Sequence, residues 1–356
     1  MNHTSASTFL ARRAPRRATR GFTLIELMVA ITLGLFLIIG LITLVVSNVT
    51  TRSELDKSAR QIESGRYAIQ VLAEDLQNAG YFGIAATTEY TGVTPAICPA
   101  AVADLGYVPK TSPGISTVPF PVYAVTTAPS CITDVMPNTA ILIVSRTSTQ
   151  PILVAAKVAT ETYMQLSNCA SDLMPFAVGA GSSSFPLLNK DCGGVSTLRK
   201  VVHRIYFLST CNVCGSDTTP TLKVAELVNG AMVTTALSEG IENLQYDYGI
   251  DMDGDGAPDC YTSNPTSPPA AEIAACPVTV PPHVWTDPTA NWTNVMAVRV
   301  HLLARNTDKT AGWSDATKYD MGLATGQVGP FADAFKRHVY STTARLYNGS
   351  GQREQP

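Results

Sequence analysis

The feature that most constrains this chain is an uncharged apolar run near its N-terminus. Residues 27–51 contain no Asp, Glu, Lys or Arg. As an α-helix the run would be about 37 Å long, which exceeds the roughly 30 Å hydrocarbon core of a bilayer. A cleaved secretory signal has a shorter apolar core and a small-residue cleavage site, whereas "NVTTRSELDK" follows this run. The sequence therefore predicts a membrane helix that stays attached.

The charges on either side of this run indicate its orientation. Residues 1–21 carry five arginines and no acidic residue, and the rest of the chain has 20 basic and 28 acidic side chains, a net charge of −8. The positive-inside rule keeps the arginines in the cytoplasm and exports the rest of the chain. Nucleic-acid binding needs clustered Lys and Arg, so we expect no nucleic-acid partner.

Glu26 is unusual because it lies at the start of the apolar run. A carboxylate inside a membrane helix costs about 2.5–3.5 kcal/mol and is by default a functional candidate. Cleavage between Gly21 and Phe22 would create an α-amino group four residues before Glu26. That amine, on the same chain or on a neighbour, could neutralise the carboxylate.

"RGFTLIELMVAITLG" resembles the class III leader of type IV pilins and pseudopilins. The resemblance implies that a prepilin peptidase cuts after Gly21 and methylates the amine of Phe22, and that Glu26 helps to recruit the subunit into a filament. Residues 1–21 would be the leader, 22–48 the transmembrane half of a long helix and 49–80 its amphipathic periplasmic half. The family's mid-helix proline is absent and Thr43 stands near that place, so a kink is not predicted.

The segment after the apolar run has helical periodicity. Apolar residues recur every three or four positions, at Leu55, Ala59, Ile62, Ile69, Leu72, Leu76 and Ala79. This predicts one apolar stripe opposite a polar face formed by Glu54, Lys57, Glu63, Glu74, Asp75 and Gln77. Gly80 and Gly83 would end the helix. Gly65 inside it costs about 1 kcal/mol relative to alanine, and a tolerated imperfection is one interpretation that the residues alone leave open.

"ESGRYAIQVLAEDLQNAGYFG" is similar to the stretch that follows the membrane helix in the PilW family of type IV pilus minor pilins. The segments "NVMAVRVHLLARNTDKT" and "FKRHVYSTTARLYN" resemble the C-terminal strands of the same family, although Tyr347 stands where the family usually has arginine. The resemblance implies that the chain is a minor pilin.

Residues 81–356 have the signals of strands rather than helices. Short apolar runs lie between Pro, Gly, Ser and Thr clusters, and several of them alternate apolar and polar residues. The runs occupy residues 140–145, 152–158, 201–209, 222–228, 243–250, 295–305 and 338–346. We expect an α+β, pilin-like fold, in which the long N-terminal helix packs on an antiparallel sheet head with disulfide-tied loops.

The eight cysteines all follow the apolar run, which indicates an oxidising compartment. Pairing of sequence neighbours gives Cys98 with Cys131, Cys169 with Cys192, Cys211 with Cys214 and Cys260 with Cys276, one of 105 possible arrangements. "CNVC" could instead be redox-active or half of a zinc site. A zinc ribbon would need a second C-x-x-C, and none occurs.

"DMDGDGAPD" is the stretch with the most evident chemistry. Asp251, Asp253, Asp255 and Asp259 offer carboxylates, the carbonyl of Ala257 could be a further ligand, and Gly256 would make the sharp turn. Alternating oxygen ligands of this kind bind Ca²⁺. The alternative is a solvated Asp/Gly turn that needs no ion.

Two further features bear on this Ca²⁺ hypothesis. The twelfth position is Thr262 rather than glutamate, which departs from the EF-hand, and Asp247 or Glu242 could supply a missing oxygen. The run "GIENLQYDYGID" before the loop is close to a run that precedes similar acidic loops in the PilW family.

The sequence offers no catalytic motif. G-x-S-x-G, H-E-x-x-H and G-x-x-x-x-G-K-[ST] are absent, and the five histidines show no ligand spacing; His301 and His338 are expected to be ordinary strand residues. No combination of nucleophile and base is evident, so we predict that the chain is not an enzyme.

Three functions are compatible with the sequence. The first is a type IV pilus minor pilin, anchored once in the bacterial inner membrane with its head in the periplasm and later incorporated into the pilus. Its partners would be the prepilin peptidase, other minor pilins and the pilus tip adhesin. The second is a type II secretion pseudopilin. The third is a signal-anchored calcium-binding adhesin or periplasmic enzyme that never enters a filament.

Overall fold

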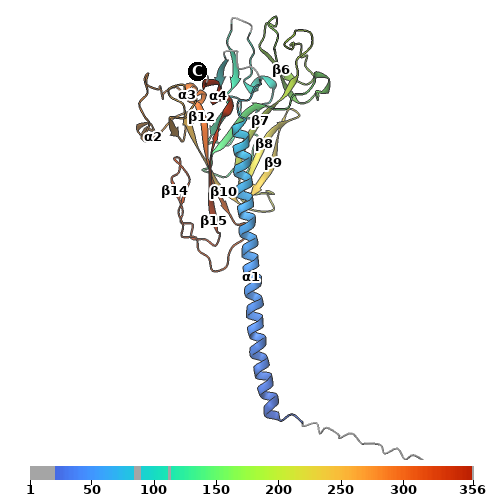
Figure 1. The fold of residues 1–356 in the computed structure, drawn as a ribbon, viewed down its shortest axis with the longest axis vertical. Coiled ribbons are helices and arrows are strands. Elements are labelled where there is room, and N and C mark those ends of the chain that lie inside the picture. The colour runs from blue at the N-terminus through green and yellow to red at the C-terminus, as the bar shows by residue number, and fades with distance from the viewer. Residues whose placement is uncertain (1–20, 84–89, 111–113, 355–356) are drawn as a thin grey trace, which may run out of the picture. The chain divides into compact units, whose positions relative to one another are not determined.

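The computed structural model describes residues 21–83, 90–110 and 114–354. The predicted leader, apart from Gly21, lies outside the described residues. The chain divides into two compact units, residues 1–55 and residues 56–356 (Figure 1).

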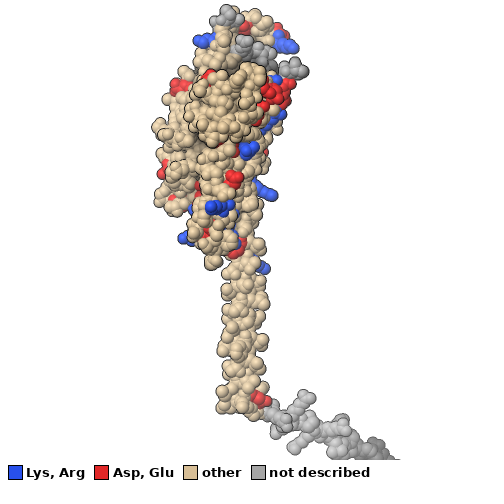
Figure 2. Space-filling view, turned by 90° about the vertical axis from the view of Figure 1, so that its left-hand side faces the viewer, with Lys and Arg blue, Asp and Glu red and all other residues tan. Residues whose placement is uncertain are grey.

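The first unit is the N-terminal part of helix α1, which as a whole runs from Leu24 to Gln77. Figure 2 shows charged surface at the two ends of this part and none along most of its length, in agreement with the uncharged residues 27–51. Its hydroxyl groups bond back to the helix: Thr32 donates to the carbonyl of Met28 at 3.0 Å, and Thr43 donates to that of Gly40 at 2.8 Å. Such internal pairing leaves the large apolar side chains outside and lets the segment face lipid. In length and composition it is a candidate membrane span.

The second unit contains the rest of α1 and a head with two larger antiparallel sheets. One sheet has seven strands: β3 to β7 follow the order β3-β4-β7-β5-β6, β8 pairs with β7, and β9 pairs with β8. The strands β7, β8 and β9 lie side by side in Figure 1. Its strands are β3 Val122–Val125, β4 Ile141–Thr147, β5 Thr162–Leu166, β6 Phe176–Ala180, β7 Leu198–Ser209, β8 Thr221–Val228 and β9 Ala231–Glu239.

The second of these sheets has four strands in the order β11-β10-β12-β15. They are β10 Ile241–Ile250, β11 Cys260–Thr262, β12 Val295–Arg305 and β15 Arg337–Arg345. Two small pairs complete the head, the parallel pair of β1 Tyr90–Val93 with β2 Ser116–Pro119 and the antiparallel pair of β13 Tyr319–Asp320 with β14 Gln327–Val328.

Short helices lie in the connections between strands and after the last strand. They are the α-helices α2 Ala270–Ala274, α3 Pro288–Thr293 and α4 Tyr347–Arg353 and the 3₁₀ helices η2 Val102–Leu105 and η3 Val154–Ala156. The expected α+β, pilin-like layout of a long helix on antiparallel sheets is confirmed, with the β structure divided between two larger sheets.

Six of the seven predicted strand runs are strands. The run 152–158 is wrong: it forms the 3₁₀ turn η3 and the extended residues around it, and apart from an isolated bridge at Ile152 it joins no sheet among the described strands. Leu153 and Val158 are largely exposed, so the run's apolar composition does not reflect burial. Alternation predicted strands such as β10, where Leu244, Tyr246 and Tyr248 belong to the main core and are at most 2 % exposed. The polar residues between them, Gln245 and Asp247, are buried as well, so burial on this strand is not confined to one face.

The predicted apolar stripe of α1 is wrong in its first half. Leu55 and Ile62 are exposed, and Ala59 is exposed as well. The buried face instead consists of Gln61, Gly65, Ala68, Leu72, Asp75 and Leu76. These positions also recur every three or four residues, but the face includes polar residues that a search for apolar periodicity passes over.

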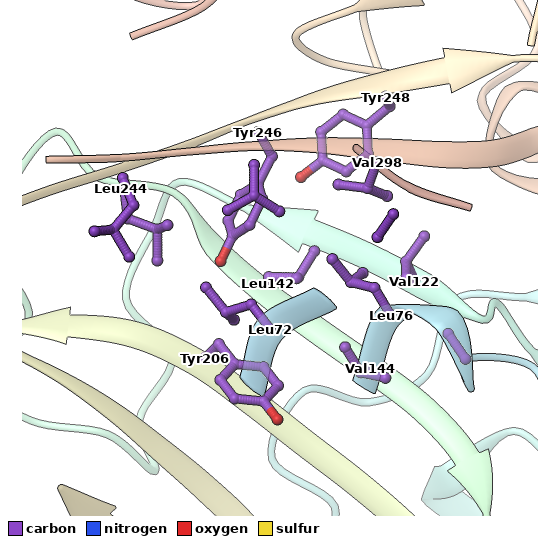
Figure 3. Packing of buried hydrophobic residues seen from close by; sticks show 14 of the residues in the cluster. Leu72, Leu76, Val122, Leu142, Val144, Tyr206, Leu244, Tyr246, Tyr248 and Val298 are labelled. Carbon is purple, nitrogen blue, oxygen red and sulfur yellow. The ribbon is translucent and has the colours of Figure 1, made fainter. Parts of the chain in front are cut away.

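The main core forms where this face meets both sheets (Figure 3). Leu72 and Leu76 from α1 pack with Leu142 and Val144 of β4, and Tyr246 of β10 belongs to the same cluster. All of these side chains are essentially inaccessible to solvent. Burying such residues contributes about 1.5–3 kcal/mol each, so this contact is the main reason the helix docks on the head.

Polar contacts fix the position of α1 on the sheets. Asp75, predicted on the polar face, is buried: Arg146 Nε donates to it at 2.7 Å, Arg204 Nη1 at 3.2 Å and the hydroxyl of Tyr206 at 2.8 Å. Gln61 donates to the carbonyls of Ala304 and Lys336 at 2.8 and 3.0 Å. A buried charge with several donors tolerates little displacement, so these contacts determine the register of the helix.

Candidate functional site

The first candidate site is the N-terminus of α1. Thr23 is the residue before the helix, and its main-chain N–H and hydroxyl donate to Glu26 Oε2 at 3.1 and 3.0 Å. The N–H of Glu26 in turn donates to Thr23 Oγ1 at 3.3 Å. This reciprocal arrangement is a capping box, and it also places the carboxylate at the positive end of the helix dipole.

Gly21 and Phe22 precede this capping box in non-helical conformation. Both are exposed, and Phe22 keeps 84 % of its surface. A Cβ added to Gly21 would meet no atom within 4 Å. The fold therefore does not require glycine at this position, and the bond between Gly21 and Phe22 is accessible to a peptidase.

The second candidate site is the acidic loop, residues 251–259, which connects β10 to β11. Asp251, Asp253 and Asp259 each bring one carboxylate oxygen within 4.8 Å of the others, as a hard divalent cation requires. Asp255 is not part of this group; its Oδ1 accepts the N–H of Ala257 at 2.7 Å. The structure thus brings together three of the four predicted aspartates.

Asp251 anchors the loop from inside. It is 1 % exposed, and its two oxygens accept the N–H groups of Gly254 at 2.7 Å and Gly256 at 3.0 Å. Gly254 and Gly256 have φ of 89° and 85°, conformations that favour glycine. The tight turn predicted at Gly256 is therefore present.

Arg353 already supplies one cation to this loop. Its Nη1 donates to Asp251 Oδ2 at 2.8 Å from the end of α4. Burial alone would raise the pKa of Asp251, but the bonds from Arg353, Gly254 and Gly256 outweigh it and hold the pKa below its usual value. The sequence interpretation missed Arg353, because 102 residues separate it from Asp251.

The two additional oxygen donors considered for calcium lie elsewhere. Glu242 is at the opposite end of β10 and binds Arg305 and Arg337 at 3.2 and 2.5 Å. Asp247 accepts the N–H of Leu323 at 3.0 Å. Both carboxylates are already paired, so neither completes the loop's coordination.

Asp247 also belongs to a polar string across three strands. His301 Nε2 lies 3.0 Å from Asp247 Oδ2, and His301 Nδ1 lies 3.1 Å from the hydroxyl oxygen of Ser341. The sequence did not reveal this combination of Asp247, His301 and Ser341, because His301 is 54 residues from Asp247 and 40 residues from Ser341. The string satisfies a carboxylate that is 1 % exposed. His301 and His338 lie on β12 and β15, as predicted.

Arg337 organises a third polar cluster. Its side chain is fully buried and donates to Glu242, Asp315 and Asp333, with distances of 2.9 Å to Asp315 and 2.6 Å to Asp333. It also stacks on the ring of Phe331, 3.8 Å from the ring centroid. The cluster holds the segment between β12 and β15 against the outer face of the four-stranded sheet.

The cysteines are joined as sequence neighbours: Cys98–Cys131, Cys169–Cys192, Cys211–Cys214 and Cys260–Cys276. The C-x-x-C pair is thus a disulfide in this structure. Asp134 lies beside it, but oxidised sulfurs are poor ligands, so these residues do not fit a zinc site.

Sequence patterns could have revealed one of the missed contacts. "TLIE" at residues 23–26 fits the capping-box pattern, a Ser or Thr followed three positions later by Glu or Gln. Asp75, Arg337 and Arg353 have no such local signal, because their partners are distant in the sequence.

Comparison with known families gives two matches. Residues 205–348 match PilW, the type IV pilus-assembly protein W family, and residues 16–42 match the prokaryotic N-terminal methylation motif. The first match contains the acidic loop and all four strands of the β11-β10-β12-β15 sheet, and the second contains Gly21, Phe22 and Glu26. No curated protein and no solved structure matches the chain significantly.

Proposed function

Since residues 205–348 match the PilW family and residues 16–42 match the prepilin-type methylation motif, we propose that the chain is a minor pilin of the type IV pilus. The prepilin peptidase would process it, and the processed chain would then join a priming or tip complex. In this proposal the membrane helix anchors the preprotein once in the inner membrane, with the head in the periplasm. The neighbours would be other minor pilins and the pilus tip adhesin. The chain acts as a structural component and not as an enzyme.

The observation that carries this proposal is the arrangement at residues 21–26. An exposed Gly-Phe bond lies directly before a helix whose first turn presents a carboxylate and whose next 25 residues carry no charge. Cleavage would place a new amine next to that carboxylate. In a low-dielectric environment, a carboxylate paired with an amine is far more favourable than a lone one.

Substitution of Gly21 by serine tests the processing step. We expect Gly21→Ser to leave the preprotein uncut, visible as a larger species on a gel. Because a Cβ at Gly21 meets nothing, the substitution does not disturb the fold, and the head should melt at the wild-type temperature. Normal processing of Gly21→Ser would contradict the assignment.

Substitution of Glu26 separates filament assembly from anchoring. A minor pilin with Glu26→Ala should be cut normally but should be strongly depleted from sheared pili. Thr23→Val is the matched control, because it removes the hydroxyl of the capping box and keeps the carboxylate. Normal incorporation of Glu26→Ala would favour a signal-anchored adhesin or periplasmic enzyme. Recovery of the chain with a type II secretion system would favour the pseudopilin.

We also propose that the acidic loop binds Ca²⁺ through Asp251, Asp253 and Asp259. The three converging carboxylates support this, and a divalent cation would relieve their repulsion. Arg353 neutralises only Asp251, so within the described part of the chain the exposed Asp253 and neighbouring Asp259 still lack a cation among their hydrogen-bond partners. Dissociation constants of about 10⁻⁴–10⁻³ M are usual for extracellular loops of this kind.

Melting curves with millimolar Ca²⁺ and with chelator test this second proposal. Calcium should raise the melting temperature of the wild-type protein, and Asp253→Ala should abolish the rise. Asp308→Ala, an acidic residue outside the loop, is the control and should retain it. Identical wild-type curves under the two conditions would exclude the calcium site.

A further inference from the structure

A groove of about 1000 Å³ lies in the head between the edges of the two larger sheets. One wall is β3 and the residues that follow it, and the opposite wall is formed by residues 263–269 and Trp292. Tyr246 and Tyr248 of β10 contribute to its floor. The volume is at the upper end of the range for ligand sites, so the groove can hold more than a small metabolite.

The lining of the groove carries no formal charge. Asp, Glu, Lys, Arg and His are all absent from the described residues that line it, although charged residues make up 15 % of the chain. The ring of Trp292 lies 4.9 Å from that of Tyr123 and 5.0 Å from that of Tyr248, which makes the inner part apolar and rigid. The lining also contains amide groups, such as those of Asn138 and Asn264, and hydroxyl groups, such as that of Thr266. A fitting occupant is therefore uncharged.

The backbone of β3 indicates which uncharged occupant fits. β3 pairs only with β4 among the described strands, so its other edge is free. The N–H of Ser145 on β4 donates to the carbonyl of Pro121 at 3.0 Å, and pairing directions alternate along an antiparallel strand. The N–H and C=O of Ala124 consequently point away from β4. Ala124 lines the groove, and these two groups have no partner among the described residues.

β10 offers a second position of the same kind. The carbonyl of Leu244 accepts the N–H of Ala140 at 3.3 Å on the edge away from β12, and Tyr248 pairs with Thr262 on that edge. Tyr246, two residues from each, directs its main chain to the same edge. It lines the groove and has no main-chain partner there among the described residues. Two strand edges thus face one uncharged groove.

We propose that this groove receives an extended, uncharged peptide segment of another pilus subunit, which adds as a strand along β3. Main-chain groups of such a segment satisfy the edge positions at Ala124 and Tyr246, and its side chains enter the apolar floor. The identity of the partner rests on the proposed function, whereas the edge geometry does not. Residues that line such a groove would be partner contacts in the assembled pilus.

Photo-crosslinking in piliated cells of the source organism tests the inference. A photoreactive amino acid replaces Thr127, which is exposed in the groove, and in a second strain Thr234, which is exposed on β9 away from it. We expect Thr127 to give an adduct that mass spectrometry maps to an uncharged segment of a pilus subunit. Thr234 should not give this adduct.

Two further substitutions test the mode of binding. Ala124→Pro removes the outward N–H while leaving the bonds to β4, since proline is tolerated where an edge N–H faces away. It should lower the adduct yield about tenfold, the effect expected from losing one main-chain hydrogen bond. Ala124→Ser keeps the N–H and should retain the yield. Asn264→Asp keeps the acceptor for Thr266 and adds a charge, so it should also lower the yield.

The processing state of the protein on the same blot distinguishes the possible failures. If the chain is cut after Gly21 but Thr127 gives no adduct, or gives one to a saccharide, the groove inference is wrong and the minor-pilin proposal stands. An adduct that survives Ala124→Pro at full yield also overturns strand addition, provided that this variant melts like Ala124→Ser. A chain that is never cut contradicts the proposed function itself.

Discussion

Gly65 shows how one residue controls the packing of the helix on the head. A Cβ at this position would lie 2.2 Å from Cε2 of Tyr340 on β15, a distance that real structures do not contain. The sequence alone left a tolerated imperfection open as one interpretation, and the structure shows a requirement for close approach. Glycine lowers the helix propensity at this position, but it allows the ring of Tyr340 to lie against the helix backbone.

Gly65→Ala should therefore destabilise the head although alanine favours helices. Overpacking costs about 1–3 kcal/mol, against a propensity gain of about 1 kcal/mol, so a modest loss should remain. Thermal melting of the purified full chain measures it. Tyr340→Ala in the Gly65→Ala background removes the clash, and alanine at residue 65 should then no longer destabilise. A melting temperature that rises in the single variant would show that β15 does not press on Gly65.

Arg337 shows how one charged residue stabilises the head. Its fully buried guanidinium serves three carboxylates, and Arg337→Ala leaves the fully buried carboxylate of Asp315 without this cation. We expect a loss of about 3–5 kcal/mol in the free energy of unfolding, measured by denaturant titration. Arg66→Ala, at an exposed position on α1, is the control and should change the free energy by less than about 0.5 kcal/mol. Equal effects of the two variants would contradict the role of the cluster.

The same cluster predicts an acid-sensitive contribution to stability. The hydrogen bonds from Arg337 hold the pKa of Asp333 at about 2, below the roughly 3.9 of an unfolded chain. The unfolded state then binds more protons between these values, so the contribution is complete above about pH 4 and is lost as the pH falls towards about 2. About a third of the Asp333 side chain is exposed, which limits the contribution to under about 1 kcal/mol. Asp333→Asn should reduce the pH dependence of the free energy of unfolding in this pH window. An unchanged slope of that free energy against pH would refute the assignment.

At the level of helices and strands, the sequence could predict the elements whose own residues show a regular apolar pattern. Alternation on β10 and β12 and the long apolar run of α1 follow from local periodicity, and neighbouring cysteines are joined. The buried face of α1 could not be predicted in the same way, because Gln61, Gly65 and Asp75 are buried for reasons that lie on distant strands. The acidic loop shows both cases: its carboxylates were evident in the sequence, and Arg353 was not.

The disulfide beside the acidic loop gives a prediction at this scale. Cys260 on β11 pairs with Cys276, a separation of 16 residues that the chain-entropy relation values at about 3 kcal/mol. Replacing both cysteines by serine should lower the free energy of unfolding by up to this amount. The double replacement of Cys211 and Cys214, separated by 3 residues, closes a much smaller loop and should cost less. The opposite order would contradict a loop-entropy origin.

For the whole molecule, the two units suit two different environments. The first is uncharged over residues 27–51 and exposes its apolar side chains, as a membrane or a filament interior requires. The second is a disulfide-tied head that matches a pilus-assembly family. Cleavage at the prepilin-type site would convert the membrane-anchored precursor into a filament subunit.

The most direct test of this account is the intact mass of the chain recovered from sheared pili. We predict a chain of residues 22–356 with one added methyl group on the amine of Phe22 and four intact disulfides. Recovery of the chain in pili with residues 1–21 still attached, or its complete absence from pili while the processed form accumulates in the inner membrane, would contradict it.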